Sequence, residues 1–180
     1  MPGRIVLQQA DIARALTRIS HEILESNRGP DDLVILGIPT RGVVLAERIA
    51  TTIRGIVGVP VETGALDVTM YRDDLSRNPM RAPSPTSVPA GGIDGRVVVL
   101  VDDVLYSGRT IRSALDALSD IGRPRIVRLA TLIDRGHREL PIRPDFVGKN
   151  LPSAQGERIF VRLQESDGEE FVRIDGEATS

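Results

Sequence analysis

Two adjacent carboxylates, Asp102 and Asp103, directly follow a strongly apolar run, residues 97–101. Such a run is typical of a buried strand in a parallel sheet, so we expect the acids at its carboxyl end, where open α/β folds bind ligands. Two acids at that edge can accept hydrogen bonds from vicinal ribose hydroxyls, directly or through a divalent cation. Asp102 and Asp103 are therefore candidate sugar-binding and metal-binding residues.

A short polar loop follows the acids and leads into a predicted helix, residues 109–119. Ser107 and Thr110 offer hydroxyls, Gly108 lets backbone amides approach a ligand, and the helix N-terminus adds its positive dipole end. Each part has a plainer explanation, because an Asp-Asp pair after a strand can be a turn with a helix cap and Ser-Gly-x-Thr is a common string. Together, over residues 98–110, they favour a site for a sugar phosphate.

The elements that position this segment follow an α/β pattern. Apolar spacing and turn residues predict helices over residues 11–27, 43–53 and 109–119, and Asp11 is the expected N-cap of the first. Extended segments are predicted over residues 33–38, 61–71, 97–101 and 125–133. Residues 158–163 and 171–174 are predicted to form a β-hairpin around Asp167-Gly168. Strands that alternate with helices indicate a mostly parallel central sheet flanked by helices. We see no internal repeat, and we expect residues 1–180 to form a single domain.

Residues 72–92 differ in composition from the rest of the chain. They contain Pro79, Pro83, Pro85 and Pro89, several serines, and too few apolar side chains to pack into a core. A connection of about twenty residues inside a compact domain is either a functional lid or a tolerated insertion. Its position beside the candidate site favours a lid.

Composition excludes several classes of protein. Hydrophobic residues make up 41% of the 180-residue chain, which argues against disorder, and the 3% aromatic content argues against aromatic stacking platforms. The chain has no cysteine, so it has no disulfide or thiolate metal site, and no apolar run long enough to span a membrane. We expect a location in the cytoplasm. A net charge of −2 argues against a general polyanion binder but leaves a local basic face possible.

Residues 98–110 resemble the signature of the type I phosphoribosyltransferases, and the competing Walker A and G-x-G-x-x-G motifs are missing. Residues 15–23, 71–75 and 134–150 are similar to the branch of that family that combines uracil phosphoribosyltransferase activity with control of a pyrimidine operon. The similarity covers roughly residues 5–175. Two departures are a proline-rich lid tip, residues 78–92, and Ser107 where threonine is frequent, which keeps the hydroxyl.

The resemblance implies the type I phosphoribosyltransferase fold, with a small hood of residues 135–150 over the base and a C-terminal β-hairpin. It implies that uracil and 5-phosphoribosyl-1-pyrophosphate (PRPP) give UMP and pyrophosphate, with Mg²⁺ held by Asp102 and Asp103 directly or through water and PRPP. Arg41 and Arg72 join the two acids as catalytic residues, and Tyr71 to Asp73 begin the lid. For pyrophosphate, the implied binding residues are Thr40, Arg41 and Gly42, in a loop that often holds a cis peptide in this family. For ribose and 5′-phosphate, they are Asp102, Asp103, Val104, Tyr106, Ser107, Gly108, Arg109 and Thr110.

The resemblance also implies an RNA-binding surface. Arg14, Arg18, His21 and Arg28 fall within about 80° of arc on the first helix, at 100° per residue. The implied RNA contacts are Arg14, Thr17, Arg18, His21, Arg28, Arg138, Arg143 and Lys149. This surface would be completed by a homodimer or higher homo-oligomer and would bind an mRNA leader stem-loop, with UMP or UTP promoting the binding. The plainer interpretation is a solvated helix face.

Three functions therefore remain open from the sequence. The first is a regulator that is also a uracil phosphoribosyltransferase. The second is a plain salvage enzyme for another base, such as hypoxanthine or orotate. The third is a catalytically weak RNA-binding nucleotide sensor that keeps the fold.

Overall fold

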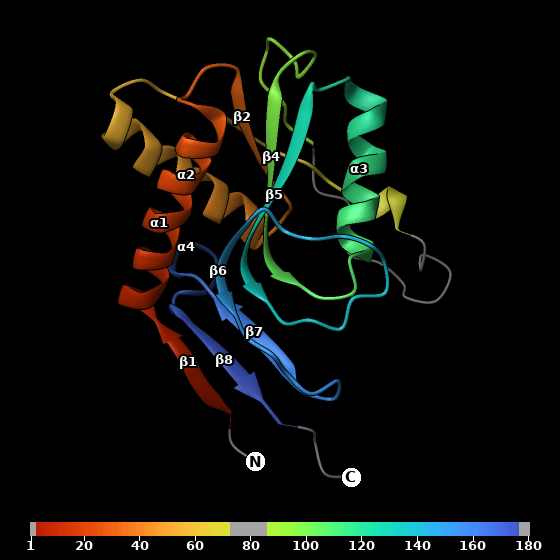
Figure 1. Cartoon of the computed structure of the whole chain (residues 1–180). Coiled ribbons are helices and arrows are strands. Elements are labelled where there is room, and N and C mark those ends of the chain that lie inside the picture. Colours follow the sequence, from red (N-terminus) through yellow and green to blue (C-terminus); the bar gives the residue numbers. More distant parts are fainter. Residues whose placement is uncertain (1–2, 73–85, 177–180) are drawn as a thin grey trace.

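The computed structural model describes residues 3–72 and 86–176 of the chain. Two sheets carry the fold, and helices cover both faces of the larger one (Figure 1). The elements are β1 (Arg4–Gln8), α1 (Gln9–Asn27), β2 (Leu33–Gly37), α2 (Arg41–Val57), β3 (Glu62–Ala65), the 3₁₀ helix η1 (Thr69–Tyr71), β4 (Val97–Leu105), α3 (Arg109–Ile121), β5 (Ile126–Asp134), β6 (Phe146–Asn150), β7 (Arg158–Arg162), α4 (Gln164–Asp167) and β8 (Phe171–Asp175).

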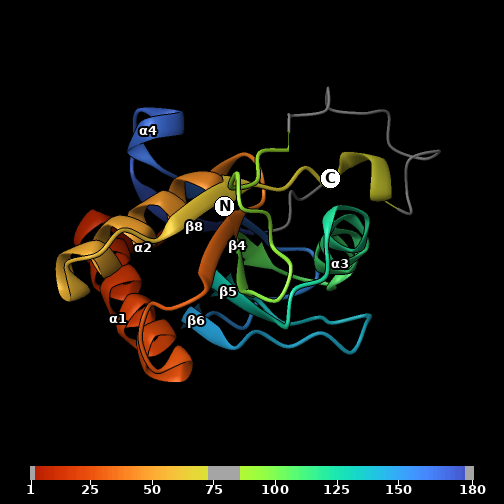
Figure 2. The same cartoon turned by 90° about the horizontal axis from the view of Figure 1, so that it is seen from above.

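The larger sheet has the strand order β3-β2-β4-β5-β6, and every neighbouring pair is parallel. Helices α1 and α2 lie on one face and α3 lies on the other, as the view from above shows (Figure 2). In β4, Val97 and Val99 pack toward α1 and α2, whereas Val98 and Leu100 pack toward α3. The predicted mostly parallel sheet flanked by helices is therefore confirmed.

Strand β4 is longer than the sequence suggested. It runs on to Leu105, because β5 continues to pair with it through Leu105 and Asp134. On its other side β2 ends at Gly37, opposite Val101. Asp102 and Asp103 thus lie within the strand, not after it, on the part of β4 that β2 no longer flanks.

The smaller sheet is antiparallel, in the order β1-β8-β7. The predicted C-terminal hairpin is confirmed, with α4 in its connection. Strands β1 and β6 were not predicted, because each has only five residues and a mixed apolar and polar composition. The expected extended segment 61–71 is a strand only over β3 and then turns into η1.

The helices begin earlier or end later than predicted. Helix α1 starts at Gln9, and Asp11 is therefore not its N-cap; its carboxylate accepts a hydrogen bond from the Gln8 amide at 2.8 Å, from the third helical position. Helix α2 starts at Arg41, so Arg41 and Gly42 belong to its first turn. No helix of the described residues has the length and apolar character needed to cross a membrane.

Most of the predicted lid falls outside the described residues, since residues 73–85 are not among them. Of the remainder, Ser87 pairs with Ala65 through an isolated antiparallel bridge, with both backbone hydrogen bonds at 2.8 Å. The C-terminal part of the predicted lid thus lies beside the last residue of β3.

Two glycines let the start of α2 approach β4 backbone to backbone. A Cβ on Gly42 would lie 2.4 Å from the carbonyl oxygen of Val101, and a Cβ on Gly37 would lie 2.3 Å from the carbonyl oxygen of Gly42. The Ile38 amide donates to the same Val101 oxygen at 2.9 Å. Any side chain at position 42 would push the first turn of α2 away from Asp102.

Gly42→Ala is therefore expected to lower the free energy of unfolding by about 1–3 kcal/mol, the usual cost of overpacking a close contact. The matched control is Gly55→Ala in the same helix, where an added Cβ meets nothing within 4 Å. That control should gain about 0.5–1 kcal/mol from the higher helix propensity of alanine. Urea unfolding checks both variants, and equal stability of the two would contradict the close contact.

Candidate active site

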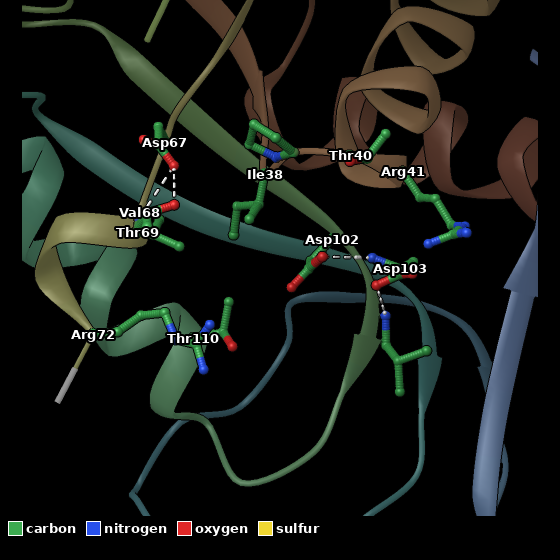
Figure 3. A pocket seen from close by; sticks show the side chains of 12 residues that line it. Ile38, Thr40, Arg41, Asp67, Val68, Thr69, Arg72, Asp102, Asp103 and Thr110 are labelled. Carbon is green, nitrogen blue, oxygen red and sulfur yellow. Dashed lines mark hydrogen bonds between the residues drawn. The ribbon is translucent and has the colours of Figure 1, made fainter. Parts of the chain in front are cut away.

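A cavity of about 320 Å³ opens at the carboxyl ends of β2 and β4, between the first turns of α2 and α3 (Figure 3). Three separate parts of the chain line it. The lining residues are Ile38, Pro39, Thr40, Arg41, Asp67, Val68, Thr69, Arg72, Asp102, Asp103, Val104 and Thr110. Seven of the predicted site residues therefore meet in one cavity, namely Thr40, Arg41, Arg72, Asp102, Asp103, Val104 and Thr110.

The two acids are oriented by the backbone that follows them. The Asp103 amide donates to Asp102 Oδ1 at 2.9 Å, and the Val104 amide donates to Asp103 Oδ1 at 2.8 Å (Figure 3). Within the described residues, no group of three or more His, Cys, Asp or Glu side chains could hold a metal ion. Two carboxylates alone suit a cation such as Mg²⁺ that keeps waters and takes further oxygens from its ligand.

The loop between β4 and α3 is the predicted anion cradle. Gly108 has a φ of +94°, and a Cβ there would lie 3.1 Å from the Ile142 side chain, so this position favours glycine. The Ser107 hydroxyl accepts a hydrogen bond from the Arg109 amide at 3.3 Å. Thr110, in the first turn of α3, reaches the cavity itself.

Residues of the predicted hood hold this loop from outside. The Glu139 and Leu140 amides donate to the Ser107 carbonyl oxygen at 2.9 and 3.1 Å. The Arg138 guanidinium donates to the Tyr106 carbonyl oxygen at 2.7 Å, to the Ile142 carbonyl oxygen at 2.8 Å and to Asp134 at 2.8 Å. Arg138, which is also a predicted RNA contact, thus holds the backbone of the loop between β4 and α3 in place.

A second cavity, of about 420 Å³, lies at the carboxyl ends of the neighbouring strands β5 and β6. Arg135, only 8% exposed, stacks its guanidinium on the Tyr106 ring at 4.3 Å, and His137 meets the same ring edge-on at 6.0 Å. The cavity is lined by Asp134, Arg135, Gly136, His137, Arg138, Asn150, Pro152 and Ser153. Tyr106 thus joins the anion cradle to this second cavity.

The loop that precedes α2 contains a cis peptide between Pro39 and Thr40, as the family resemblance implied. Arg41 follows it and forms a bidentate ion pair with Asp167 of α4, with Nε–Oδ2 at 3.0 Å and NH2–Oδ1 at 2.7 Å. Hydrogen bonds from Arg41 are the main reason that the pKa of Asp167 is lowered to about 2. The pKa of Arg41 is raised, chiefly by Asp167, and the charge of Asp103 adds to the effect.

Sequence reasoning missed several residues of the site. Asp67 accepts hydrogen bonds from the amide and the hydroxyl of Thr69, at 3.1 and 2.6 Å, in a turn that closes one wall of the cavity. The Asp-x-Thr spacing of such a turn is a signal that could have found it. Asp167 was assigned to a hairpin turn, and nothing in its local sequence indicates a contact with Arg41.

The predicted RNA contacts other than Arg138 lie along α1 or directly after it, on β6, and on the loop before β6. Arg14, Thr17, Arg18 and His21 are exposed along α1, and Arg28 is exposed directly after its last residue. Lys149 is exposed on β6, and its charge contributes to the lowered pKa of Asp11, after the larger effects of the Gln8 amide and Arg14. Lys149 therefore lies near the first turn of α1, whereas Arg143 is exposed on the loop before β6.

Arg14 and Arg18 differ in what they touch. Arg14 is 71% exposed and pairs with Asp11 on its own helix at 2.5 Å. Arg18 pairs with Glu22 and also donates to the carbonyl oxygens of Val147 and Gly148, at 3.1 and 2.5 Å, so it fastens α1 to β6. Arg14 is thus the cleaner probe of a surface function.

Nearly the whole chain is similar to known phosphoribosyl transferase proteins. The model of the phosphoribosyl transferase domain matches residues 4–165. The chain is 74% identical to a Bifunctional protein PyrR of Leifsonia xyli subsp. xyli, over 97% of this chain and 98% of that protein. It is 62% identical to a Bifunctional protein PyrR of Streptomyces coelicolor, over 96% and 89% of the two chains.

Two solved structures with a similar fold are purine phosphoribosyltransferases. A hypoxanthine-guanine phosphoribosyltransferase of Bacillus anthracis matches with a TM-score of 0.72 at 16% identity, over 94% of this chain and 96% of that one. A hypoxanthine phosphoribosyltransferase of Trypanosoma cruzi matches with a TM-score of 0.73 at 16% identity, over 95% and 94%. At this identity the likeness concerns the fold alone.

Proposed function

We propose a function for this chain from the family to which it belongs, the phosphoribosyl transferase domain family and, within it, the PyrR proteins. The chain converts uracil and PRPP to UMP and pyrophosphate. It also regulates pyrimidine genes by binding mRNA. The observation that carries the catalytic half is the meeting of Thr40 and Arg41 with Asp102, Asp103 and Thr110 in one cavity. These groups suit the diphosphate, ribose and 5′-phosphate of a single ligand.

The reaction breaks the bond from the anomeric carbon to pyrophosphate and joins that carbon to a uracil nitrogen, whose proton is balanced by the departing pyrophosphate. Positive charge develops on the ribose while negative charge collects on the leaving group, so fixed donors near the diphosphate lower the barrier. Arg41 and Arg72 line the cavity and are the guanidinium groups placed to neutralise that charge. Asp102 and Asp103 hold the ribose hydroxyls and so fix the position of the reacting carbon.

The 5′-phosphate binds the cradle of Tyr106 to Thr110, at the N-terminus of α3. Backbone amides and the helix dipole favour a dianion there, and the Ser107 and Thr110 hydroxyls can add hydrogen bonds. The Mg²⁺ ion that accompanies PRPP fits the carboxylates of Asp102 and Asp103, where it would offset the charge of the diphosphate. Gly42 contributes by letting this half of the site close against β4.

Uracil is proposed to occupy the cavity at the ends of β5 and β6, under the hood of residues 135–150. The lining there includes Gly136 and the backbone that leads from Asp134 to Arg138. Recognition by backbone groups would suit a small base with two carbonyl oxygens and two N–H groups. The hypoxanthine enzymes share only the fold and carry no argument for a purine substrate.

Asp102→Asn together with Asp103→Asn is expected to abolish UMP formation while the protein stays folded. Each lost charge-assisted hydrogen bond costs roughly 1.5–3 kcal/mol, so kcat/KM for PRPP should fall by about 10²–10⁴-fold. Asp116→Asn, an exposed acid on α3, is the matched control and should leave kcat/KM unchanged. Wild-type turnover by the double variant would exclude these acids from the site.

The choice of base is tested by incubating the protein with PRPP, Mg²⁺ and one base at a time. Formation of UMP with uracil, and no nucleotide with hypoxanthine or orotate, supports the proposal. Turnover of another base would favour a plain salvage enzyme. If no base is converted while RNA is retained, the chain acts as a nucleotide sensor.

The regulatory half rests on the basic side chains that α1 and β6 expose together. Arg14, Arg18 and His21 lie on α1, and Lys149 lies near its first turn. Their charges are partly offset by Asp11 and Glu22, so one subunit offers a modest basic surface. We propose that a homodimer or higher oligomer enlarges this surface to bind an mRNA leader stem-loop, with UMP or UTP promoting the binding.

Arg14→Ala is expected to weaken RNA binding and to lower the slope of log affinity against log salt by about 0.7–1, the loss of one phosphate contact. UMP formation should stay at the wild-type level, because Arg14 pairs only locally with Asp11 and does not line either described cavity at the sheet edge. Arg54→Ala, an exposed arginine of α2, controls for net charge. An equal effect of the two variants on RNA would mean that α1 is an ordinary solvated face.

A further inference from the structure

The ion pair between Arg41 and Asp167 joins the first turn of α2 to the short helix α4, 126 positions later in the chain. Arg41 lines the cavity, while Asp167 comes from the connection between β7 and β8. Both side chains are largely shielded, with 22% and 14% of their surfaces exposed. A shielded pair of this kind fixes the direction in which the guanidinium points.

Asp167 is held in place by groups other than Arg41. The Leu163 amide donates to Asp167 Oδ2 at 2.8 Å, and the Ser166 hydroxyl lies 3.1 Å from the same oxygen. Helix α4 ends at Gly168, which has a φ of +71°. The Gly168 amide donates a hydrogen bond to the Gln164 carbonyl oxygen at 3.1 Å. The carboxylate is thus a fixed point to which the longer and more flexible arginine attaches.

The pairing leaves the guanidinium able to bind a second anion. Asp167 takes the edge formed by Nε and NH2, which uses two of the five N–H donors of arginine. Three donors remain for the oxygens of a diphosphate, and the planar group cannot rotate away while one edge is held. The charge of Asp103 also contributes to the raised pKa of Arg41, so the guanidinium that pairs with α4 is within electrostatic reach of the acid pair.

We propose that Asp167 is a positioning residue that aims Arg41 at the pyrophosphate end of PRPP. This inference rests on the proposed function and adds a residue to it. It also gives the C-terminal hairpin a role in the reaction, because the β7–β8 connection carries the carboxylate. Asp167 does not touch the substrate; it acts through Arg41.

The chain contains a matched control for this ion pair. Arg48, two turns further along α2, forms a bidentate pair with Glu165 of α4, at 2.9 and 2.6 Å, and a second contact with Glu170 at 2.5 Å. Arg48 and Glu165 bridge the same two helices but do not line the cavity of about 320 Å³ described above. Glu165→Gln therefore tests the docking of α4 on α2 without touching Arg41.

Asp167→Asn is expected to raise the KM for PRPP and the inhibition constant of pyrophosphate about tenfold, the loss expected for one charge-assisted hydrogen bond. The kcat and the KM for uracil should stay within about threefold of wild type. Asp167→Glu, which keeps the charge but moves the carboxylate by one methylene, should also raise the KM for PRPP. Glu165→Gln should leave all of these constants unchanged, and circular dichroism checks that each variant is folded.

A double-mutant cycle completes the test. In an Arg41→Ala background, Asp167→Asn should have no further effect on the KM for PRPP, because its target is gone. The inference is overturned if Asp167→Asn keeps the wild-type KM, if it lowers the KM as release of a competing anion would, or if Glu165→Gln has the same effect.

Calorimetric titration with Mg²⁺ and PRPP, or Mg²⁺ and pyrophosphate, separates this inference from the proposed activity because it needs no base. If the wild type binds PRPP but does not convert uracil, the proposed activity fails, and the comparison of Asp167→Asn with Glu165→Gln still decides the role of Asp167. If the wild type binds neither ligand, both proposals fail.

Discussion

The contact between the first turn of α2 and the backbone of β4 is the constraint on which the rest of the site depends. Gly37 and Gly42 bring Ile38 and Val101 within hydrogen-bond distance, and the loop of Thr40 and Arg41 then lies beside Asp102. Because β2 ends opposite Val101, the last part of β4 is unflanked on that side and opens into the cavity. Side chains that are about sixty positions apart in the chain thereby line one cavity.

The hood and the anion cradle form one hydrogen-bonded unit. Arg138 ties the Tyr106 carbonyl oxygen to Asp134 at the end of β5, and Arg18 ties α1 to the neighbouring strand β6. Basic residues that the sequence grouped into one predicted RNA-binding set therefore differ in their contacts within the fold. Arg138 and Arg18 stabilise the tertiary structure, whereas Arg14 and Lys149 remain on the surface.

The sequence predicted those parts of the fold and site whose information is local. The apolar runs of β2 and β4 identified the parallel sheet, and the acid pair with the predicted phosphate loop is contiguous from Asp102 to Thr110. It could not reveal β6, whose five residues include only two apolar ones, or the pairing of Arg41 with Asp167. A contact between two charged residues so distant in the chain leaves no periodicity, and only the folded chain shows it.

The proposed function requires PRPP to bind at the carboxyl edge of the larger sheet through two loops at once. Amide chemical shifts of ¹⁵N-labelled protein, followed by NMR during titration with Mg²⁺ and PRPP in the absence of base, test it most directly. Saturable shifts in both segments, residues 40–42 and 106–110, at the same ligand concentration are the predicted result. Shifts confined to other elements, or in only one of the two loops, would contradict the binding of PRPP by both loops.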